Sequence, residues 1–148
     1  MKDQQEPITD NEWILRRVHL SWFAPAGPTA INPYAFKPQI GGDLPDTTGI
    51  SFYRLSCIVD FNDILAKTVE AKRPKYGIVR LPVSLLASLG LNVKRNDDVD
   101  APIVLGHVIM PGINSINYSQ DKDAVLPKMK LLADYVNEHQ EFLRLPSI

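Results

Sequence analysis

The stretch from Ser21 to Thr48 limits the possible fold more than any other part of the sequence. It contains five prolines and three glycines. Because proline lacks a backbone N–H and glycine favours turns, no helix or long strand can run through it. An irregular connection longer than ~12–15 residues in a compact domain is usually functional or disordered. Embedded aromatic residues favour an ordered loop lying across a sheet, with Phe36 as one anchor.

The length and composition indicate one globular domain. The chain has 148 residues, of which 45% are hydrophobic and 22% are charged. These fractions are typical of folded domains rather than disordered chains. We expect a flexible leader over residues 1–10 and a single globular domain over residues 11–148. The formal net charge of −1 argues against a nucleic-acid partner, since such domains are usually basic.

Cysteine content and hydropathy favour a cytoplasmic protein. Cys57 is the only cysteine, so no intrachain disulfide can form, and its apolar neighbours predict a buried, inert thiol. The first ten residues are polar, so we expect no signal peptide. No apolar run approaches the ~20 residues that a membrane-spanning helix needs, so we expect no membrane partner.

Hydrophobic periodicity predicts an α+β fold. We expect strands over residues 12–20, 48–55, 76–81, 91–94 and 103–110. We expect helices from Phe61 to Lys72 or Arg73, over 82–89, and after a loop ending at Asp121, the last with an apolar stripe from Leu126 to Phe142. Residues 96–102 read as an acidic turn. This order predicts a single domain with a small mixed or antiparallel sheet, two or three helices and the long proline-rich loop.

The first predicted strand carries the first candidate site residues. Alternation puts Arg17 and His19 on one face, about 6–7 Å apart along the strand. Both can reach one anionic group, and an arginine offers a planar fork of donors to it; alternatively, this is a solvated edge face. Ser51 and Tyr53 add hydroxyl donors from the second strand.

The late apolar strand carries another candidate, His107. A histidine among apolar residues must find a hydrogen-bond partner. It is either a core histidine satisfied by a carbonyl or hydroxyl group, or a donor, base or ligand-orienting group facing a pocket. Gly106 beside it would let a backbone segment or a ligand approach closely.

Familiar site motifs do not assign a cofactor or catalytic residues. The chain has three histidines, and they show no close pairing with cysteine or aspartate, so we expect no metal site. No phosphate-binding loop, dinucleotide fingerprint or G-x-S-x-G elbow is present.

Four short motifs resemble a group of short, uncharacterised bacterial proteins. They are Arg16-Arg17-Val18-His19, Phe36-Lys37-Pro38, Gly49-Ile50-Ser51 and Gly106-His107-Val108-Ile109. Such proteins carry an Arg-Arg-aliphatic-His strand, a Phe-x-Pro loop, a Gly-aliphatic-Ser strand and a late histidine-containing strand, in this order. The resemblance spans roughly residues 13–111 and implies a bacterial protein without implying an activity.

The chain is more distantly similar to ADP-ribosyltransferase-like domains. That similarity implies NAD bound between split sheets, with Arg17 or His19 holding its phosphate or ribose and Ser51 supporting the nicotinamide ribose. Such transferases usually place a glutamate on a late strand, whereas this chain has no glutamate between Glu70 and Glu138.

Three hypotheses follow, and the sequence leaves enzymatic activity open. The first is a pocket formed by Arg17, His19, Ser51 and His107, closed by the proline-rich loop, that binds a small anionic ligand or a partner. We include Phe36 and Tyr53 among its residues. The second is an ADP-ribosyltransferase-like enzyme that uses NAD. The third is a structural interaction protein or homodimer module, whose interface is formed by Trp22, Tyr34 and Phe36.

Overall fold

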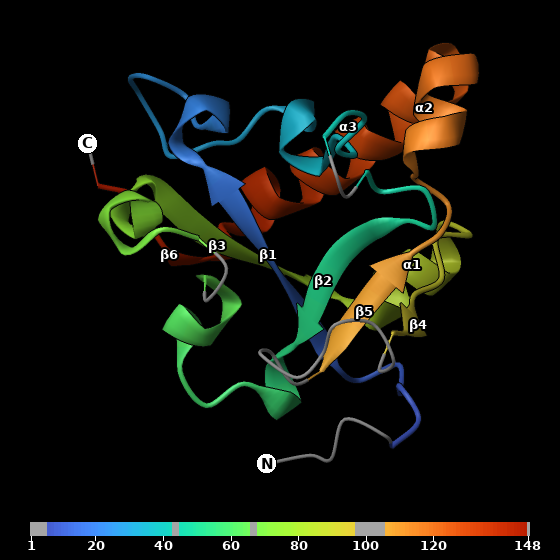
Figure 1. Cartoon of the computed structure of the whole chain (residues 1–148), viewed down its shortest axis with the longest axis horizontal. Coiled ribbons are helices and arrows are strands. Elements are labelled where there is room, and N and C mark those ends of the chain that lie inside the picture. The colour runs from blue at the N-terminus through green and yellow to red at the C-terminus, as the bar shows by residue number, and fades with distance from the viewer. Residues whose placement is uncertain (1–5, 43–44, 66–67, 97–105, 148) are drawn as a thin grey trace.

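The computed structural model describes residues 6–42, 45–65, 68–96 and 106–147. Six strands form one antiparallel sheet in the order β4-β5-β2-β1-β3-β6 (Figure 1). The strands are β1 (Trp13–His19), β2 (Ile50–Arg54), β3 (Tyr76–Pro82), β4 (Lys94–Arg95), β5 (His107–Met110) and β6 (Phe142–Arg144). The helices are α1 (Val83–Ser88), α2 (Ser115–Gln120) and α3 (Lys122–His139). The predicted α+β class is confirmed.

The central strand β1 pairs unequally with its two neighbours. Its pairing with β3 runs along the whole strand, from Trp13 opposite Pro82 to His19 opposite Tyr76. Its register with β2 comprises Ile14 opposite Arg54 and Leu15 opposite Tyr53. Beyond Leu15, β1 and β2 separate (Figure 1). The two strands are therefore paired at one end, called the closed end below, and apart at the other, where an opening lies between them.

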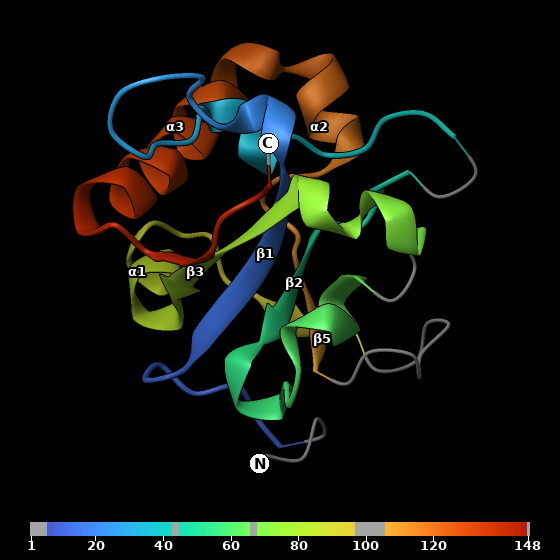
Figure 2. The same ribbon diagram turned by 90° about the vertical axis from the view of Figure 1, so that its left-hand side faces the viewer.

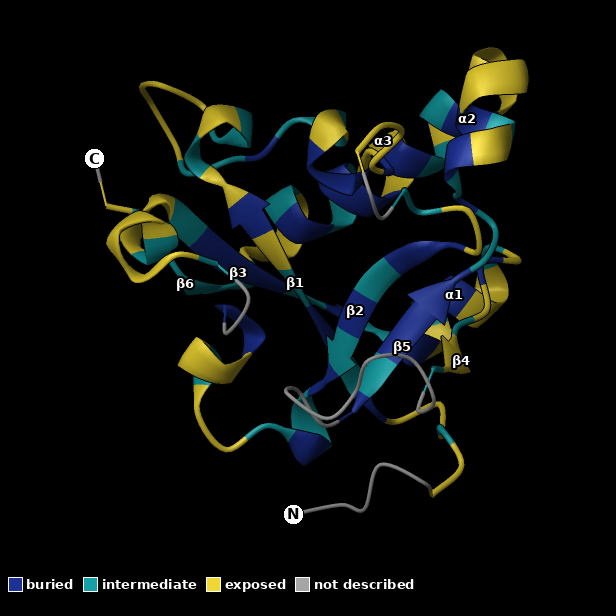
Figure 3. Cartoon of the chain, in the orientation of Figure 1, coloured by how far each residue is buried: buried dark blue, intermediate teal, exposed yellow. Residues whose placement is uncertain are grey.

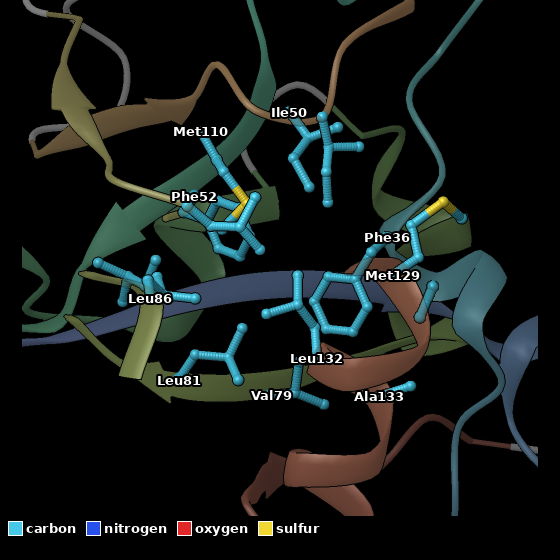
Figure 4. Packing of buried hydrophobic residues seen from close by; sticks show 14 of the residues in the cluster. Phe36, Ile50, Phe52, Val79, Leu81, Leu86, Met110, Met129, Leu132 and Ala133 are labelled. Carbon is cyan, nitrogen blue, oxygen red and sulfur yellow. The ribbon is translucent and has the colours of Figure 1, made fainter. Parts of the chain in front are cut away.

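The larger core lies between the sheet and α3 (Figure 4). From β1 it takes Ile14 and Val18, as the predicted alternation requires. Met129 and Leu132 enter it from α3 and are fully buried. Removing a large apolar side chain from water contributes roughly 1.5–3 kcal/mol, so this face holds most of the fold's stabilising burial.

The opposite face of the sheet has a smaller core. Leu15, Ile64 and Ile78 form it, under 3₁₀ turns that lie across the sheet from α3 (Figure 2). These turns, Phe61–Leu65 and Glu70–Lys75, replace the helix predicted from Phe61. Pro74 lies inside the second turn, and proline opposes continuous helical hydrogen bonding.

The proline-rich loop is ordered where the structure describes it and is fixed to both layers. Phe36, fully buried, stacks on Phe52 of β2 at a ring-centroid distance of 6.4 Å. The Asn137 side chain of α3 accepts from Ile31 N at 2.8 Å and donates to Ile31 O at 2.9 Å. These contacts hold the loop over one end of the sheet, with exposed residues on its outer side (Figure 3).

The C-terminal third differs from the prediction in two places. The segment expected as a loop before Asp121 contains α2, because Asn114 and Asn117 form a reciprocal capping box at its start. The last helix ends earlier than expected, at a left-handed Gln140 with φ 51°. Phe142 therefore belongs to β6, which pairs with β3.

Cys57 is buried, as predicted, and its side chain lies so close to Gly106 that it explains why a glycine is found there. Gly106 has φ +79°, and a Cβ atom there would lie 2.6 Å from the Cys57 Cβ atom. Glycine is thus required by a close approach within the fold.

The predicted acidic turn and the first part of the predicted strand over 103–110 fall largely on residues 97–105, outside the described residues. Among the helices of the described residues, none combines the length and the hydropathy that a membrane span requires.

A buried ion pair closes the other end of the β1–β2 pair. Arg54 is fully buried and binds Glu12 with two donors, at Nε–Oε1 2.8 Å and Nη2–Oε2 2.9 Å. Its guanidinium also donates to the carbonyl oxygens of Glu6 and Pro7, so these two residues of the predicted leader lie against the domain. Burial raises the pKa of Glu12, but hydrogen bonds and the charge of Arg54 lower it more, to about 2.

Candidate functional site

A pocket of about 520 Å³ lies where β1 and β2 separate. Its walls come from the second half of β1, from Ser51 and Tyr53 of β2, from Tyr76 and from the proline-rich loop. Among the described residues that line it are three cationic side chains, Arg16, Arg17 and Lys37, and one carboxylate, Asp46. The pocket is therefore predominantly positive although the chain is nearly neutral.

Arg16 lies at the base of the opening and ties its walls together. Its Nε donates to Ala35 O at 2.8 Å, and its Nη1 donates to Ser51 O at 2.9 Å. A longer bond of 3.4 Å joins Nη2 to Lys37 O. The guanidinium thus bridges three segments: β1, the loop and β2.

The charge of Arg16 is not neutralised by an ion pair with any described residue. Burial lowers its pKa to about 10, although Asp46 acts in the opposite direction. The group stays protonated at neutral pH. A base whose pKa falls in the folded protein carries an incompletely compensated charge, which an anion beside it would stabilise.

Arg17 and His19 both contact the ring of Tyr76, at the other side of the opening. The Arg17 guanidinium carbon lies 5.5 Å from the Tyr76 centroid, and Nη1 donates to Thr68 Oγ1 at 2.7 Å. The His19 ring meets Tyr76 edge-on at 5.1 Å. Tyr76 thus holds the two β1 side chains together, as the predicted shared face requires.

The hydrogen bonds between the His19 ring and Ser21 determine which tautomer the neutral ring adopts. Its Nδ1 accepts from the backbone N–H of Ser21 at 3.1 Å, so in the neutral ring the proton is on Nε2. The Ser21 hydroxyl also lies 2.9 Å from Nδ1. Neutral His19 therefore offers an N–H donor from Nε2.

Ser51, Tyr53 and His107 form a second cluster on the same face of the sheet. His107 Nε2 lies 2.9 Å from Ser51 Oγ, and the His107 ring lies 5.4 Å from the Tyr53 ring. His107 is half-buried and has the hydroxyl neighbour considered for a core histidine. Burial raises the pKa of Tyr53, so its hydroxyl remains a donor at neutral pH.

The structure brings four of the six predicted site residues to one pocket lining. Arg17, His19, Ser51 and Tyr53 line it. His107 contacts it through Ser51, without being part of the lining. Phe36 lies in the core, and its backbone neighbours Ala35 and Lys37 provide the loop wall.

Sequence reasoning missed Arg16 and the carboxylate Asp46 as site residues. Arg16 alternates with Arg17, so its side chain begins on the core face and reaches the opening only because β1 and β2 separate. Asp46 is held by the Gln39 backbone N–H at 2.7 Å. Arg16 belongs to the Arg-Arg-aliphatic-His motif, but alternation places it on the face opposite Arg17, and no short motif includes Asp46.

Within the described ranges, no group of three or more histidine, cysteine, aspartate or glutamate side chains is arranged to hold a metal ion. The donors of the pocket are instead guanidinium, ammonium, imidazole and hydroxyl groups. Such a set suits an anion with hydrogen-bond acceptors. Comparison with known protein families, with curated proteins and with solved structures finds no match for this chain.

Proposed function

We propose that this protein binds a small anionic ligand in the pocket between β1, β2 and the proline-rich loop. The observation that carries the proposal is Arg16, a half-buried guanidinium held by carbonyl oxygens and lacking a carboxylate partner among the described residues. Charge-assisted hydrogen bonds to an anion are about twice as strong as neutral ones. A bound anion would supply the missing counter-charge.

The dimensions support a ligand larger than a single inorganic anion. A volume of about 520 Å³ lies within the roughly 300–1,000 Å³ range of small-molecule sites. Trp22 and Tyr34, at a ring-centroid distance of 5.7 Å, add aromatic surface from the loop. The favoured ligand carries a phosphate or carboxylate group on an organic body.

Thermal unfolding in the presence of inorganic phosphate and ribose 5-phosphate tests this proposal. A ligand that binds the folded state raises the melting temperature by mass action. We expect a rise that grows with concentration, and we expect Arg17→Ala to abolish it while unfolding stays cooperative. Lys94→Ala is the matched control, because it removes an exposed cation on β4, away from the pocket. An unchanged shift in Arg17→Ala refutes the role of Arg17, and no shift with either anion refutes the proposal.

A second candidate is NAD binding in an ADP-ribosyltransferase-like manner. The separation of β1 and β2, with Arg17 and His19 on one strand and Ser51 on the other, is the observation that favours it. The carboxylate among the described lining residues is Asp46, on the loop rather than a late strand. Including NAD in the thermal series separates the candidates: this alternative requires a larger shift with NAD than with ribose 5-phosphate at equal concentration.

The interaction-module hypothesis has weaker support. Of its three aromatic residues, Phe36 is fully buried within its own chain and Trp22 packs against the core. Tyr34 is 42% exposed. Light scattering tests this hypothesis, which requires a dimer together with the absence of any response to the anions.

A further inference from the structure

The β2 wall of the pocket carries a serine hydroxyl beside an imidazole. Ser51 lines the pocket, and its Oγ lies 2.9 Å from His107 Nε2 on the neighbouring strand β5. We propose that Ser51 and His107 are a nucleophile–base pair that hydrolyses a small carboxylic ester, whose anionic group is held by the cationic side of the pocket. The proposal rests on the anion-binding function above and adds a reaction to it.

The geometry of the pair matches what covalent catalysis requires. A nucleophile and its base lie about 2.6–3.2 Å apart in active sites of this kind. In the tautomer with the proton on Nδ1, the Nε2 lone pair of His107 accepts from the Ser51 hydroxyl. The Tyr53 ring, tilted by 47° against the imidazole, limits the orientations that the imidazole can adopt.

The charge of Arg16 lies next to the serine. Its Nη1 donates to the carbonyl oxygen of Ser51 itself at 2.9 Å. A guanidinium this close favours negative charge that develops on the reacting atoms, and in a half-buried position its effect is stronger than in water. Arg16 therefore combines two roles, as a brace between strands and as a source of positive potential.

The reaction proceeds in two balanced halves. The Ser51 oxygen attacks the ester carbonyl carbon and passes its proton to His107 Nε2, while the carbonyl electron pair moves onto the carbonyl oxygen. That pair then returns, the bond to the alcohol oxygen breaks, and the alcohol leaves with the proton from His107. Water next attacks the acyl carbon, giving its proton to His107, and the Ser51 oxygen leaves and takes that proton back. The products are an alcohol and a carboxylic acid.

The cationic lining predicts which esters react fastest. Arg17 and Lys37 line the same pocket as Ser51, so an ester with a free carboxylate gains an interaction that a neutral ester lacks. We expect 4-nitrophenyl hydrogen succinate to be hydrolysed with a higher kcat/KM than 4-nitrophenyl acetate. Arg17→Gln should remove most of that preference, measured as the ratio of the two kcat/KM values.

A fluorophosphonate provides the direct test, because it reacts with an activated serine by forming an O–P bond and releasing fluoride. We expect intact-mass analysis to show one phosphonyl group, located on Ser51 by peptide mapping. Ser51→Ala should remove labelling, and His107→Gln should slow it by about 100-fold or more, the usual effect of a general base. Ser84→Ala, an exposed serine on α1, is the control and should label at the wild-type rate.

The outcomes separate this proposal from the binding function. Labelling confined to Ser51 and dependent on His107 supports the nucleophile–base pair. Absence of labelling, labelling elsewhere, or a wild-type rate in His107→Gln overturns it; His107→Asn replaces that variant if thermal unfolding shows that it does not fold. A phosphate-induced shift in melting temperature without Ser51 labelling leaves the binding function standing and removes only the reaction.

Discussion

The two ends of the β1–β2 pair each hold an arginine, and the two arginines have opposite surroundings. Arg54 is fully buried and is bound by both carboxylate oxygens of Glu12. Arg16, at the other end, is bound by carbonyl oxygens of the loop and of β2. The first charge is neutralised within the fold, whereas the second has no carboxylate partner among the described residues. Arg54 is also fully buried and Arg16 half-buried, so partners and burial together distinguish the arginine that stabilises the fold from the one on which we base the proposed anion site.

The largest expected effect on the free energy of unfolding comes from removing the Glu12–Arg54 ion pair at the closed end of the β1–β2 pair. Glu12→Gln removes the carboxylate and leaves the Arg54 charge buried, which typically costs about 3–5 kcal/mol. We expect urea unfolding to show a destabilisation of this size. Phosphate should still raise the melting temperature of the folded fraction, because Glu12 does not line the pocket. A loss below about 1 kcal/mol would contradict the assigned role of the ion pair.

Low pH should lower the stability of the wild-type protein through the same ion pair. The pKa of Glu12 is lowered to about 2 in the folded state, so its contribution is fully present above the ordinary glutamate pKa of about 4.3 and is lost as pH falls towards 2. A shift of this size corresponds to roughly 3 kcal/mol. Urea unfolding at several pH values measures the slope, and Glu12→Gln should reduce it. Equal slopes in both proteins would refute the assignment.

Arg16→Met should destabilise the protein less than Glu12→Gln does, and it should abolish phosphate binding. The carbonyl groups of Ala35 and Ser51 lose their donor, which destabilises, while the cost of burying a charge is relieved. We expect a net loss of about 1–2 kcal/mol and no phosphate shift. Arg16→Lys is the matched comparison, since it keeps the charge without the planar fork, and it should retain part of the shift. A full phosphate shift in Arg16→Met would contradict our comparison of the two arginines.

The smallest effect on stability is expected for Arg17→Ala. Arg17 is exposed and donates to Thr68 Oγ1, and surface substitutions usually change the free energy of unfolding by less than about 0.5 kcal/mol. Urea unfolding should therefore match the wild type within that range. A larger loss would show that Arg17, like Arg54, serves the fold.

Local pattern was sufficient to predict much of the sheet and one side of the pocket. Alternation along β1 put Arg17 and His19 on one face, and they contact the same Tyr76 ring. It failed at two places. The helix expected from Phe61 is replaced by two 3₁₀ turns, the second of which contains Pro74. Phe142 lies in β6 rather than in the last helix because this segment pairs with β3, a strand distant in the sequence.

By itself, the sequence determined the periodicity of the strands, the break in regular structure from Ser21 to Thr48 and the presence of adjacent cations on one strand. These depend on neighbouring residues, whose backbone geometry is locally constrained. Only the tertiary structure decided that β1 and β2 separate beyond Leu15, that Arg16 reaches across the opening, and that His107 meets Ser51. Those contacts join residues 35 and 56 positions apart, and they depend on which strands become neighbours in the sheet, which the pattern within a single strand does not determine.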